Sequence, residues 1–209
     1  MRLQQYLIES PIFDTDHWEE LRNNLNKDCK PFIKELKGAS ELLYRGVKRS
    51  EIPDFYTIKT TRTNRRPRFV HMDLHNELGS YLKSKFGWNP RTEGLFTTKS
   101  ISNAYSWGNP VIIFPIGKFK YIWIENAHDL YGSYDSYSDL DPDSPTRKLV
   151  FKNIKRIVDV EYNSTNLNKY LSIPSHTTTE CIIKCDRYYS INIEWLETLK
   201  GYYCNRYQG

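Results

Sequence analysis

Apolar residues at helical spacing open the chain and predict a helical lead-in. From Trp18 to Leu25 they recur three and four positions apart, and acidic and hydroxyl residues that can cap a helix come just before them. Pro31 breaks this pattern and begins a second short helix, which is predicted to end near Gly38. Residues 1–38 are therefore expected to be largely helical.

Short apolar runs bounded by Gly, Pro or polar residues follow the lead-in, and they predict a set of strands. The runs cover residues 42–47, 95–98, 111–115, 119–124, 179–184 and 188–191. The last two flank Asp186-Arg187, and we expect them to form a hairpin across these two residues.

The remaining segments are assigned to helices and loops. Helical spacing recurs in residues 74–86, which Gly87 ends, in a short segment that ends at Trp107, and in residues 193–199. Polar composition predicts loops at residues 60–68, 131–146 and 163–178, the second of them exposed. A further apolar run covers residues 147–162.

The composition is that of a folded, β-containing protein of 209 residues. Hydrophobic residues make up 39% of the chain and aromatic residues 14%, with 16 tyrosines, and this composition argues against disorder. No repeat or linker divides the sequence, so we expect one domain over residues 1–209. The net charge of +5 weakly favours an anionic partner.

Cysteine usage indicates a reducing compartment. The four cysteines form no C-x-x-C pair and no signal peptide precedes them, so we expect free thiols and a cytoplasmic protein. No apolar run approaches about 18 residues, and no membrane span is predicted.

One charged side chain interrupts the strand predicted at residues 42–47. Arg45 shares the strand face of Leu43, so a permanent cation points toward the interior. Burying a guanidinium is costly unless an anion meets it, and Gly46 lets another backbone or a ligand come close. Two interpretations stay open: a pocket for a phosphate or carboxylate ligand, or an arginine paired with a surface acid.

Four arginines crowd into the predicted loop at residues 60–68: Arg62, Arg65, Arg66 and Arg68. They favour a loop that contacts phosphates, either of a dinucleotide or of a nucleic acid. The alternative is a solvated basic turn, although like charges this close repel one another without a counter-anion.

No metal site is predicted. His71 and His75 lie four positions apart, but no third ligand follows at a convincing spacing. Asp139, Asp141 and Asp143 resemble the start of a calcium loop, yet its central glycine and closing glutamate are missing.

Three kinds of polar residue lie on or at the ends of predicted strands, in the order arginine, hydroxyl cluster, glutamate. They lie in the segments Tyr44-Arg45-Gly46, Phe96-Thr97-Thr98-Lys99-Ser100-Ile101 and Glu180-Cys181-Ile182-Ile183. In this order the segments resemble the ADP-ribosyltransferase superfamily, in its arginine-serine-glutamate branch. That branch has an aromatic-Arg-Gly strand, an aromatic-x-Ser-Thr-Ser-apolar strand, and a Glu followed by an apolar strand. The resemblance covers most of the chain.

The resemblance implies an α+β fold, with an ADP-ribosyltransferase-like core of two packed, mostly antiparallel small sheets and N-terminal helices. It implies an enzyme that cleaves NAD, its co-substrate, and transfers ADP-ribose to an acceptor protein or nucleic acid. By analogy, a small member of this kind would suit a phage or a bacterial toxin system.

The resemblance also implies roles for individual residues. Glu180 would stabilise the positive charge that develops on the ribose, Thr98 would hold Glu180 in position, and Arg45 would bind a phosphate. Gly46, Ser100, Arg66 and Tyr105 would add to the NAD site, where stacking by Tyr105 or Trp107 and a core role for these rings are both open. Thr178, Arg62 and Arg65 would face the acceptor, and the loop at residues 163–178 would present it.

The chain departs from the family pattern at two points. Thr98-Lys99-Ser100 stands where Ser-Thr-Ser is usual, and this keeps the first hydroxyl. Thr178 stands two positions before Glu180, where members that modify arginine have a second Glu, so arginine is not the expected acceptor. Two alternatives stay open: a NAD glycohydrolase with water as the acceptor, and a non-catalytic module that binds a nucleotide or nucleic acid.

Overall fold

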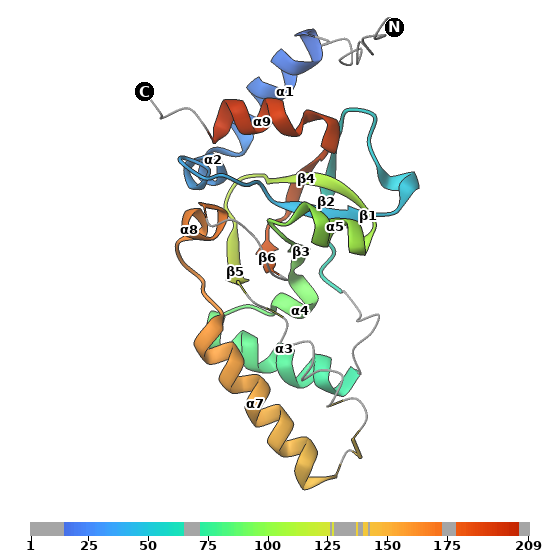
Figure 1. Cartoon of the computed structure of the whole chain (residues 1–209), viewed down its shortest axis with the longest axis vertical. Helices are drawn as coiled ribbons and strands as arrows, with labels where there is room; N and C mark the ends of the chain where they lie inside the picture. The colour runs from blue at the N-terminus through green and yellow to red at the C-terminus, as the bar shows by residue number, and fades with distance from the viewer. Residues whose placement is uncertain are drawn as a thin grey trace, which may run out of the picture.

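The computed structural model describes residues 15–64, 72–125, 127, 137, 140–141, 143–172 and 179–204. Over these residues the chain is an α+β fold with two small antiparallel sheets and eight α-helices (Figure 1). The predicted fold class, with helices ahead of the first strand, is confirmed at this level. The helices nearest the two chain ends lie beside one sheet, and two longer helices lie at the opposite end of the molecule.

The strands are distributed over a four-stranded and a three-stranded sheet. The first has the order β1 (Tyr44–Val47), β4 (Asn109–Pro115), β7 (Arg187–Asn192), β2 (Tyr56–Thr60). The second has the order β3 (Leu95–Thr97), β6 (Glu180–Lys184), β5 (Lys120–Ile124). Every neighbouring pair is antiparallel.

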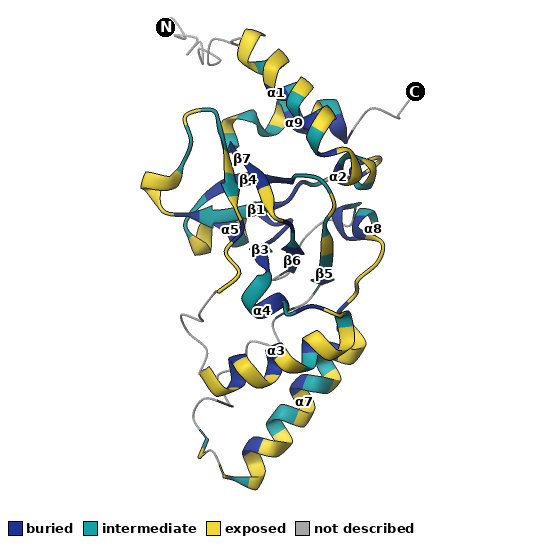
Figure 2. Cartoon of the chain, turned by 180° about the vertical axis from the view of Figure 1, so that it is seen from behind, coloured by how far each residue is buried: buried dark blue, intermediate teal, exposed yellow. Residues whose placement is uncertain are grey.

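The helices form three groups around these sheets, and the group at the far end is largely exposed on its outer side (Figures 1 and 2). At one end lie α1 (Thr15–Asp28), α2 (Lys30–Glu35) and α9 (Leu196–Tyr203). Close to the sheets lie the short helices α4 (Pro90–Glu93), α5 (Ile101–Trp107) and α8 (Leu167–Ser172). At the other end lie α3 (Met72–Phe86) and α7 (Pro145–Glu161). Two single 3₁₀ turns, η1 (Arg49–Glu51) and η2 (Ile193–Trp195), complete the described elements.

Two hydrophobic clusters hold the layers together. One joins the terminal helices to the four-stranded sheet and to one face of β6, where it includes Ile183. The other joins α3 and α7 to the opposite face of β6, where it includes Ile182. Burying one such side chain completely contributes about 1.5–3 kcal/mol. Because alternate residues of a strand face opposite sides, Glu180 shares the face of Ile182 and so lies on the side of α3 and α7.

The predicted hairpin between residues 179–184 and 188–191 is wrong. Both segments are strands, but β6 pairs with β3 and β5, whereas β7 pairs with β4 and β2. The chain crosses between the sheets at Asp186, whose carbonyl accepts a hydrogen bond from the N–H of Thr61 at 2.9 Å. Gly117, with a φ of +69°, lies at a similar crossing from β4 to β5. A short turn reverses the chain, but it does not determine which sheet the next strand joins.

Other segments differ from the pattern-based predictions. The strand β2 was not predicted and takes Thr60 from the expected basic loop, and α8 lies within the predicted loop at residues 163–178. Tyr137, from a segment predicted to be exposed, is buried, with its ring 4.3 Å from the Arg147 guanidinium carbon. Residues 1–14 of the helical lead-in lie outside the described residues.

The predicted helix at residues 74–86 and the short helix that ends at Trp107 are confirmed as α3 and α5. Gly87, with a φ of +74°, follows α3 in the left-handed conformation that glycine adopts readily. None of the described helices combines the length and the apolar character that a membrane crossing requires.

Candidate functional site

The two sheets are joined where β1 runs past the end of β3. The N–H of Tyr44 donates to the carbonyl of Thr98 at 2.7 Å, and the N–H of Thr98 donates to the carbonyl of Tyr44 at 2.9 Å. Arg45, the next residue, donates from Nη1 to the carbonyl of Phe96 at 2.8 Å. The backbone therefore fixes Arg45 of one sheet beside the Thr98 segment of the other.

Glu180 enters the same region through the register of β3 and β6. These strands pair Thr97 with Cys181, so the next step of the register places Thr98 opposite Glu180. Directly opposite residues of an antiparallel pair have Cβ atoms about 5 Å apart. The segments of Arg45, Thr98 and Glu180, which are far apart in the sequence, thus lie in one region, which we call the strand junction.

The carboxylate of Glu180 lies inside the protein. The residue is only 2% exposed, and its Oε1 accepts a hydrogen bond from the hydroxyl of Tyr162 at 2.6 Å. Tyr162 follows directly after α7 and is itself buried. Hydrogen bonds to a charged acceptor are among the stronger ones in proteins, so Tyr162 fixes the orientation of the carboxylate. The sequence signals Tyr162 only as the end of an apolar run, and its partner was not predicted.

The hydroxyl groups near Glu180 form a short chain of hydrogen bonds. The oxygens of Thr98 and Thr179 lie 2.8 Å apart, and the Thr98 hydroxyl accepts from the N–H of Ser100 at 3.1 Å. Ser100 caps α5 by accepting from the N–H of Asn103 at 3.3 Å. The described bonds of the Thr98 hydroxyl therefore go to Thr179, the residue before Glu180, and to Ser100, and a role of Thr98 in positioning Glu180 stays a prediction.

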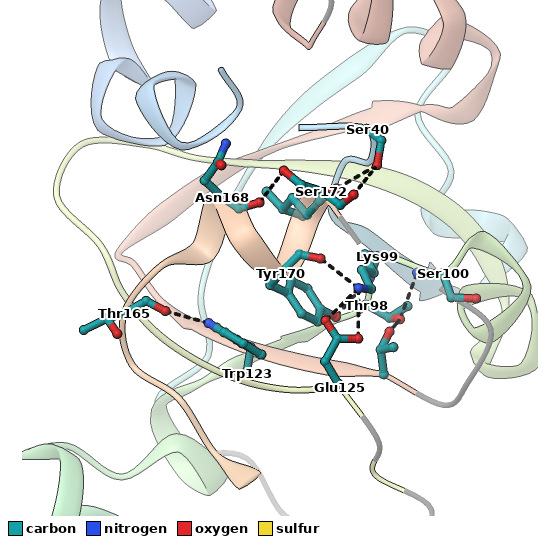
Figure 3. Close-up of polar contacts among 12 residues, drawn as sticks. Ser40, Thr98, Lys99, Ser100, Trp123, Glu125, Thr165, Asn168, Tyr170 and Ser172 are labelled. Carbon is teal, nitrogen blue, oxygen red and sulfur yellow. Dashed lines mark hydrogen bonds and ion pairs between the residues drawn. The ribbon is translucent and has the colours of Figure 1, made fainter. Parts of the chain in front are cut away.

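Lys99, between the two hydroxyl residues, is an unexpected part of this region (Figure 3). Its side chain is 0% exposed, and Nζ lies 2.8 and 3.0 Å from the two carboxylate oxygens of Glu125. The same amine donates to the carbonyl of Tyr170 at 2.8 Å and lies 4.6 Å from the centre of the Tyr170 ring. Lys99 therefore ties β3 to α8 and to the end of β5. The sequence placed a lysine here, but nothing in it indicated Glu125 as the partner.

Burial keeps the neighbouring phenols and thiol protonated. It raises the pKa of Tyr170 well above its usual range, and Tyr170 accepts a hydrogen bond from the N–H of Lys99 at 3.2 Å. Burial, together with the nearby Glu41 carboxylate, raises the pKa of Tyr44. Burial also raises the pKa of the Cys181 thiol. These groups act near neutral pH as neutral hydrogen-bonding or packing groups, and none of them is an activated nucleophile.

Gly46 is required by packing. A Cβ atom on Gly46 would lie 2.4 Å from the carbonyl oxygen of Ala104 and 2.6 Å from the carbonyl carbon of Trp107. The backbone of α5 therefore occupies the space that the missing side chain leaves. Of the two interpretations of this glycine, the structure shows the close approach of another backbone.

The aromatic residues of α5 point outward. Tyr105 is 60% exposed and Trp107 is 38% exposed, so neither ring belongs to the hydrophobic core of the chain. They lie on the helix that packs against β1, the strand of Arg45. Of the two open interpretations, a core role is excluded and stacking on a ligand stays a prediction.

Arg62, predicted to contact the acceptor, is exposed and lies just after β2. Burial raises the pKa of Tyr188 on β7, while the positive charges of Arg45 and Arg62 both act to lower it. Both guanidinium groups are therefore close enough to one phenol to influence its ionisation.

Several predicted site residues cannot be placed against this geometry. Arg65, Arg66 and Thr178 lie outside the described residues, as does His71. His75 is buried on α3. Among the residues that the structure describes, no three His, Cys, Asp or Glu side chains gather as metal ligands would.

A hollow with a volume of about 620 Å³ lies away from the strand junction, between α3 and α7. Its lining residues are Asn76, Glu77, Ser80, Tyr81, Phe151 and Lys155. The hollow and the junction are thus separate features, because none of the junction residues contributes to its lining.

Comparison of the chain with the sequence models of protein families, with curated proteins and with solved structures finds no match.

Proposed function

We propose that this chain is a mono-ADP-ribosyltransferase, which cleaves NAD and transfers ADP-ribose to a protein or nucleic acid. The observation that carries the proposal is that the segments of Arg45, Thr98 and Glu180 lie together at the strand junction. A cation, a hydroxyl and a carboxylate are supplied by three separate segments in the order of the family motifs. This agreement between motif order and spatial proximity supports the resemblance drawn from the sequence.

In the proposed reaction, the bond between the nicotinamide nitrogen and C1′ of the ribose breaks, and its electron pair leaves with nicotinamide. Positive charge develops on the ribose, and Glu180 stabilises this charge, as carboxylates do in glycoside cleavage. A nucleophilic atom of the acceptor then forms a bond to C1′ and releases its proton to solvent. The products are free nicotinamide and the ADP-ribosylated acceptor.

The remaining junction residues bind and position in this scheme. Arg45 holds a phosphate oxygen of NAD through charge-assisted hydrogen bonds, and Arg62 adds a second positive charge beside Tyr188. Tyr162 orients the Glu180 carboxylate by its bond of 2.6 Å. A carboxylate can accept about four hydrogen bonds, so this bond is compatible with a ribose hydroxyl that donates to the same group.

One observation favours a second candidate, a non-catalytic module that binds a nucleotide. Glu180 is 2% exposed, and this degree of burial is also typical of an acid whose role is structural. In this candidate Arg45 and Arg62 bind phosphate, and Glu180 only anchors Tyr162 and the end of α7. The two candidates differ in whether removing the Glu180 charge changes NAD turnover.

The test uses the full chain, NAD labelled on its adenylate part, and a cell lysate as the source of acceptors. We expect label to enter a macromolecule with wild-type protein and not with Glu180→Gln. The glutamine keeps an oxygen that accepts from Tyr162, so the fold should persist. The matched control is Glu161→Gln, which removes an exposed acid next to Tyr162 and should leave transfer unchanged.

The outcomes separate the candidates. Equal transfer by wild type and Glu180→Gln would contradict the catalytic role of Glu180. NAD binding without nicotinamide release would identify the non-catalytic module. Nicotinamide release without any acceptor, lost in Glu180→Gln, would identify a NAD glycohydrolase.

A further inference from the structure

The outer face of α7 carries a row of exposed cations. Lys148, Lys152 and Arg156 follow one another at intervals of four residues, and all three are exposed. With a rise of 1.5 Å per residue, successive members are about 6 Å apart along the helix axis. Within the described part of the chain, none of the three forms an ion pair. We call these three residues the cationic row.

Other charges of this region have structural partners, which makes the row stand apart. Arg147 pairs with Asp73 of α3 at 3.3 Å. Asp159 pairs with Lys85 at 3.0 Å and accepts from the hydroxyl of Tyr81 at 2.6 Å. These pairs join α7 to α3, whereas the described hydrogen bond of Arg156 goes to Asn153 on its own helix, at 3.3 Å.

The cationic row lowers the stability of the helix that carries it. Like charges four residues apart destabilise a helix by about 0.2–0.5 kcal/mol per pair, and the row contains two such pairs. The helix dipole favours acids in the first turn and bases in the last. The first turn of α7 has no acid and its last turn has no base, while Asp159 and Glu161 lie near its C-terminus. The stability of the helix therefore does not explain this charge order, whereas binding of an anionic partner would.

The spacing of the row indicates the chemistry of that partner. A regular row of cations matches a polymer with regularly repeated anions, and the phosphates of a nucleic acid are such a polymer. An amphipathic helix that lies in a membrane surface has a continuous apolar face beside its cations. The large apolar side chains exposed on α7 are Leu149 and Val160, 66% and 71% exposed. They are eleven positions apart, about 16 Å along the helix, and so form no such face.

The hollow beside α7 extends this surface. Lys155 lies at its edge, with its amine 5.3 Å from the centre of the Tyr81 ring and 4.7 Å from that of Phe151. Asn76 and Ser80 of α3 line the same hollow with groups that can hydrogen-bond to a sugar or a base. A strand that follows the cationic row would have polar and aromatic surface alongside its phosphates.

We propose that the exposed face of α7 is a nucleic-acid binding surface, with the cationic row bound to successive phosphates. The proposal goes beyond the NAD chemistry and does not rest on it, because binding requires only this helix. If the proposed function holds as well, a nucleic acid bound here is a candidate acceptor. The helix that carries the row is followed by Tyr162, which holds Glu180.

The test measures binding of the full chain to fluorescent RNA, single-stranded DNA and duplex DNA by anisotropy, and to anionic vesicles by co-sedimentation, at several salt concentrations. The variant replaces the row: Lys148→Gln, Lys152→Gln and Arg156→Gln together. Each lost phosphate contact lowers the slope of log affinity against log salt by about 0.7–0.9. We therefore expect a slope reduced by about 2–3 for the preferred nucleic acid, and affinity at least tenfold weaker at low salt.

The matched control removes the same net charge elsewhere. Lys27→Gln, Lys30→Gln and Lys34→Gln together neutralise three exposed lysines of α1 and α2, and binding should be nearly unchanged. Thermal unfolding of the row variant should occur at or slightly above the wild-type temperature, because repulsion is relieved.

Four results would overturn the proposal. They are equal weakening by both triple variants, absence of binding to all three nucleic acids, binding to anionic vesicles in place of nucleic acid, and loss of binding that merely follows unfolding of the row variant. Because no readout involves NAD, failure here is distinct from failure of the proposed enzymatic function.

Discussion

The strand junction and the outer face of α7 differ in where their polar groups lie: inside the protein at the junction, and facing solvent on α7. Near the junction, Lys99 binds Glu125 and Tyr170, and Glu180 binds Tyr162, all within the protein. On α7 the cationic row faces solvent and repels itself. Buried polar groups contribute to the folding energy, so the main effect of substituting them is a change in the stability of the protein. Exposed, unpaired charges contribute little to folding, so substituting them reports on a partner.

Removing the charge of one lysine in each region should give the largest difference in the free energy of unfolding. Lys99→Met leaves Glu125 and the Tyr170 carbonyl without their buried cation, and we expect a loss of about 3 kcal/mol in the free energy of unfolding. This value is the lower end of the range for breaking a buried ion pair, about 3–5 kcal/mol, because the Glu125 side chain is a third exposed. Lys152→Met on α7 should change it by less than about 0.5 kcal/mol.

Urea denaturation measures both free energies. Equal, small effects of the two variants would contradict the view that Lys99 is a structural cation. Lys99→Arg provides a further check, because it keeps the charge and should restore part of the stability.

The hydroxyl of Tyr162 tests how strongly the junction depends on one hydrogen bond. Tyr162→Phe removes the donor to Glu180, and we expect a loss of about 1.5–3 kcal/mol, as for bonds to charged groups. Tyr105→Phe, on an exposed tyrosine of α5, is the matched control and should be neutral. If Glu180 is catalytic, kcat for nicotinamide release should fall in Tyr162→Phe more than KM rises. A change in stability alone, with wild-type kcat, would assign Tyr162 a purely structural role.

Glycine substitution compares a close contact with an open position. Gly46→Ala would place a methyl group 2.4 Å from the Ala104 carbonyl oxygen, and we expect it to cost about 1–3 kcal/mol as α5 moves away from β1. A methyl group on Gly201, in α9, would have no such neighbour within 4 Å. Gly201→Ala should stabilise the protein by about 0.5–1 kcal/mol. Thermal unfolding of both variants measures the contrast, and a neutral Gly46→Ala would contradict the packing role.

Local structure was predictable from the sequence, because it depends on local patterns. The spacing of apolar residues from Leu74 to Phe86 and the glycine that follows are sufficient to define α3. The apolar run after Glu180 is likewise sufficient to define β6. The order of Arg45, the hydroxyls and Glu180 resembles a family pattern, and the fold brings these three segments near one another, while their shared role at an NAD site stays a prediction.

Partners distant in the sequence were not predictable in the same way. The turn at Asp186 has the composition of a hairpin, yet β7 joins the other sheet, because its pairing depends on β4 and β2. Lys99 stood out only as a departure from a motif, and its partner Glu125 lies 26 positions away. A single sequence gives side-chain types and local periodicity, whereas such contacts depend on how whole elements pack.

The ion pair of Glu93 and Lys184 offers a pH test on the three-stranded sheet. The hydrogen bond from Lys184 lowers the pKa of Glu93 below its usual value. A lowered folded-state pKa stabilises the protein above the pKa of the unfolded chain, and this contribution is lost as pH falls through the folded value. The free energy of unfolding of the wild type should exceed that of Glu93→Gln by about 0.5–1 kcal/mol near pH 6. This difference should vanish in acid.

The control for this pH test is Glu161→Gln on α7, which removes an exposed acid that lies outside the described ion pairs. Unfolding free energies between pH 3 and 6 for all three proteins provide the measurement. A constant difference between wild type and Glu93→Gln over this range would show that charge is not its source.

The last comparison reverses one charge in the cationic row. Lys152→Glu replaces two repulsive neighbours, Lys148 and Arg156, by two attractive ones, so the free energy of unfolding should rise by about 0.8–2 kcal/mol. Nucleic-acid affinity should fall in the same variant, because a negative charge now faces the phosphates. Lys34→Glu on α2 is the matched control, with little change expected in affinity. Calorimetry and anisotropy on the same samples test whether stability and binding move in opposite directions. A variant that loses both stability and nucleic-acid affinity would indicate that Lys152 stabilises the fold. The polar groups of α7 would then have a structural role, as those of the strand junction do.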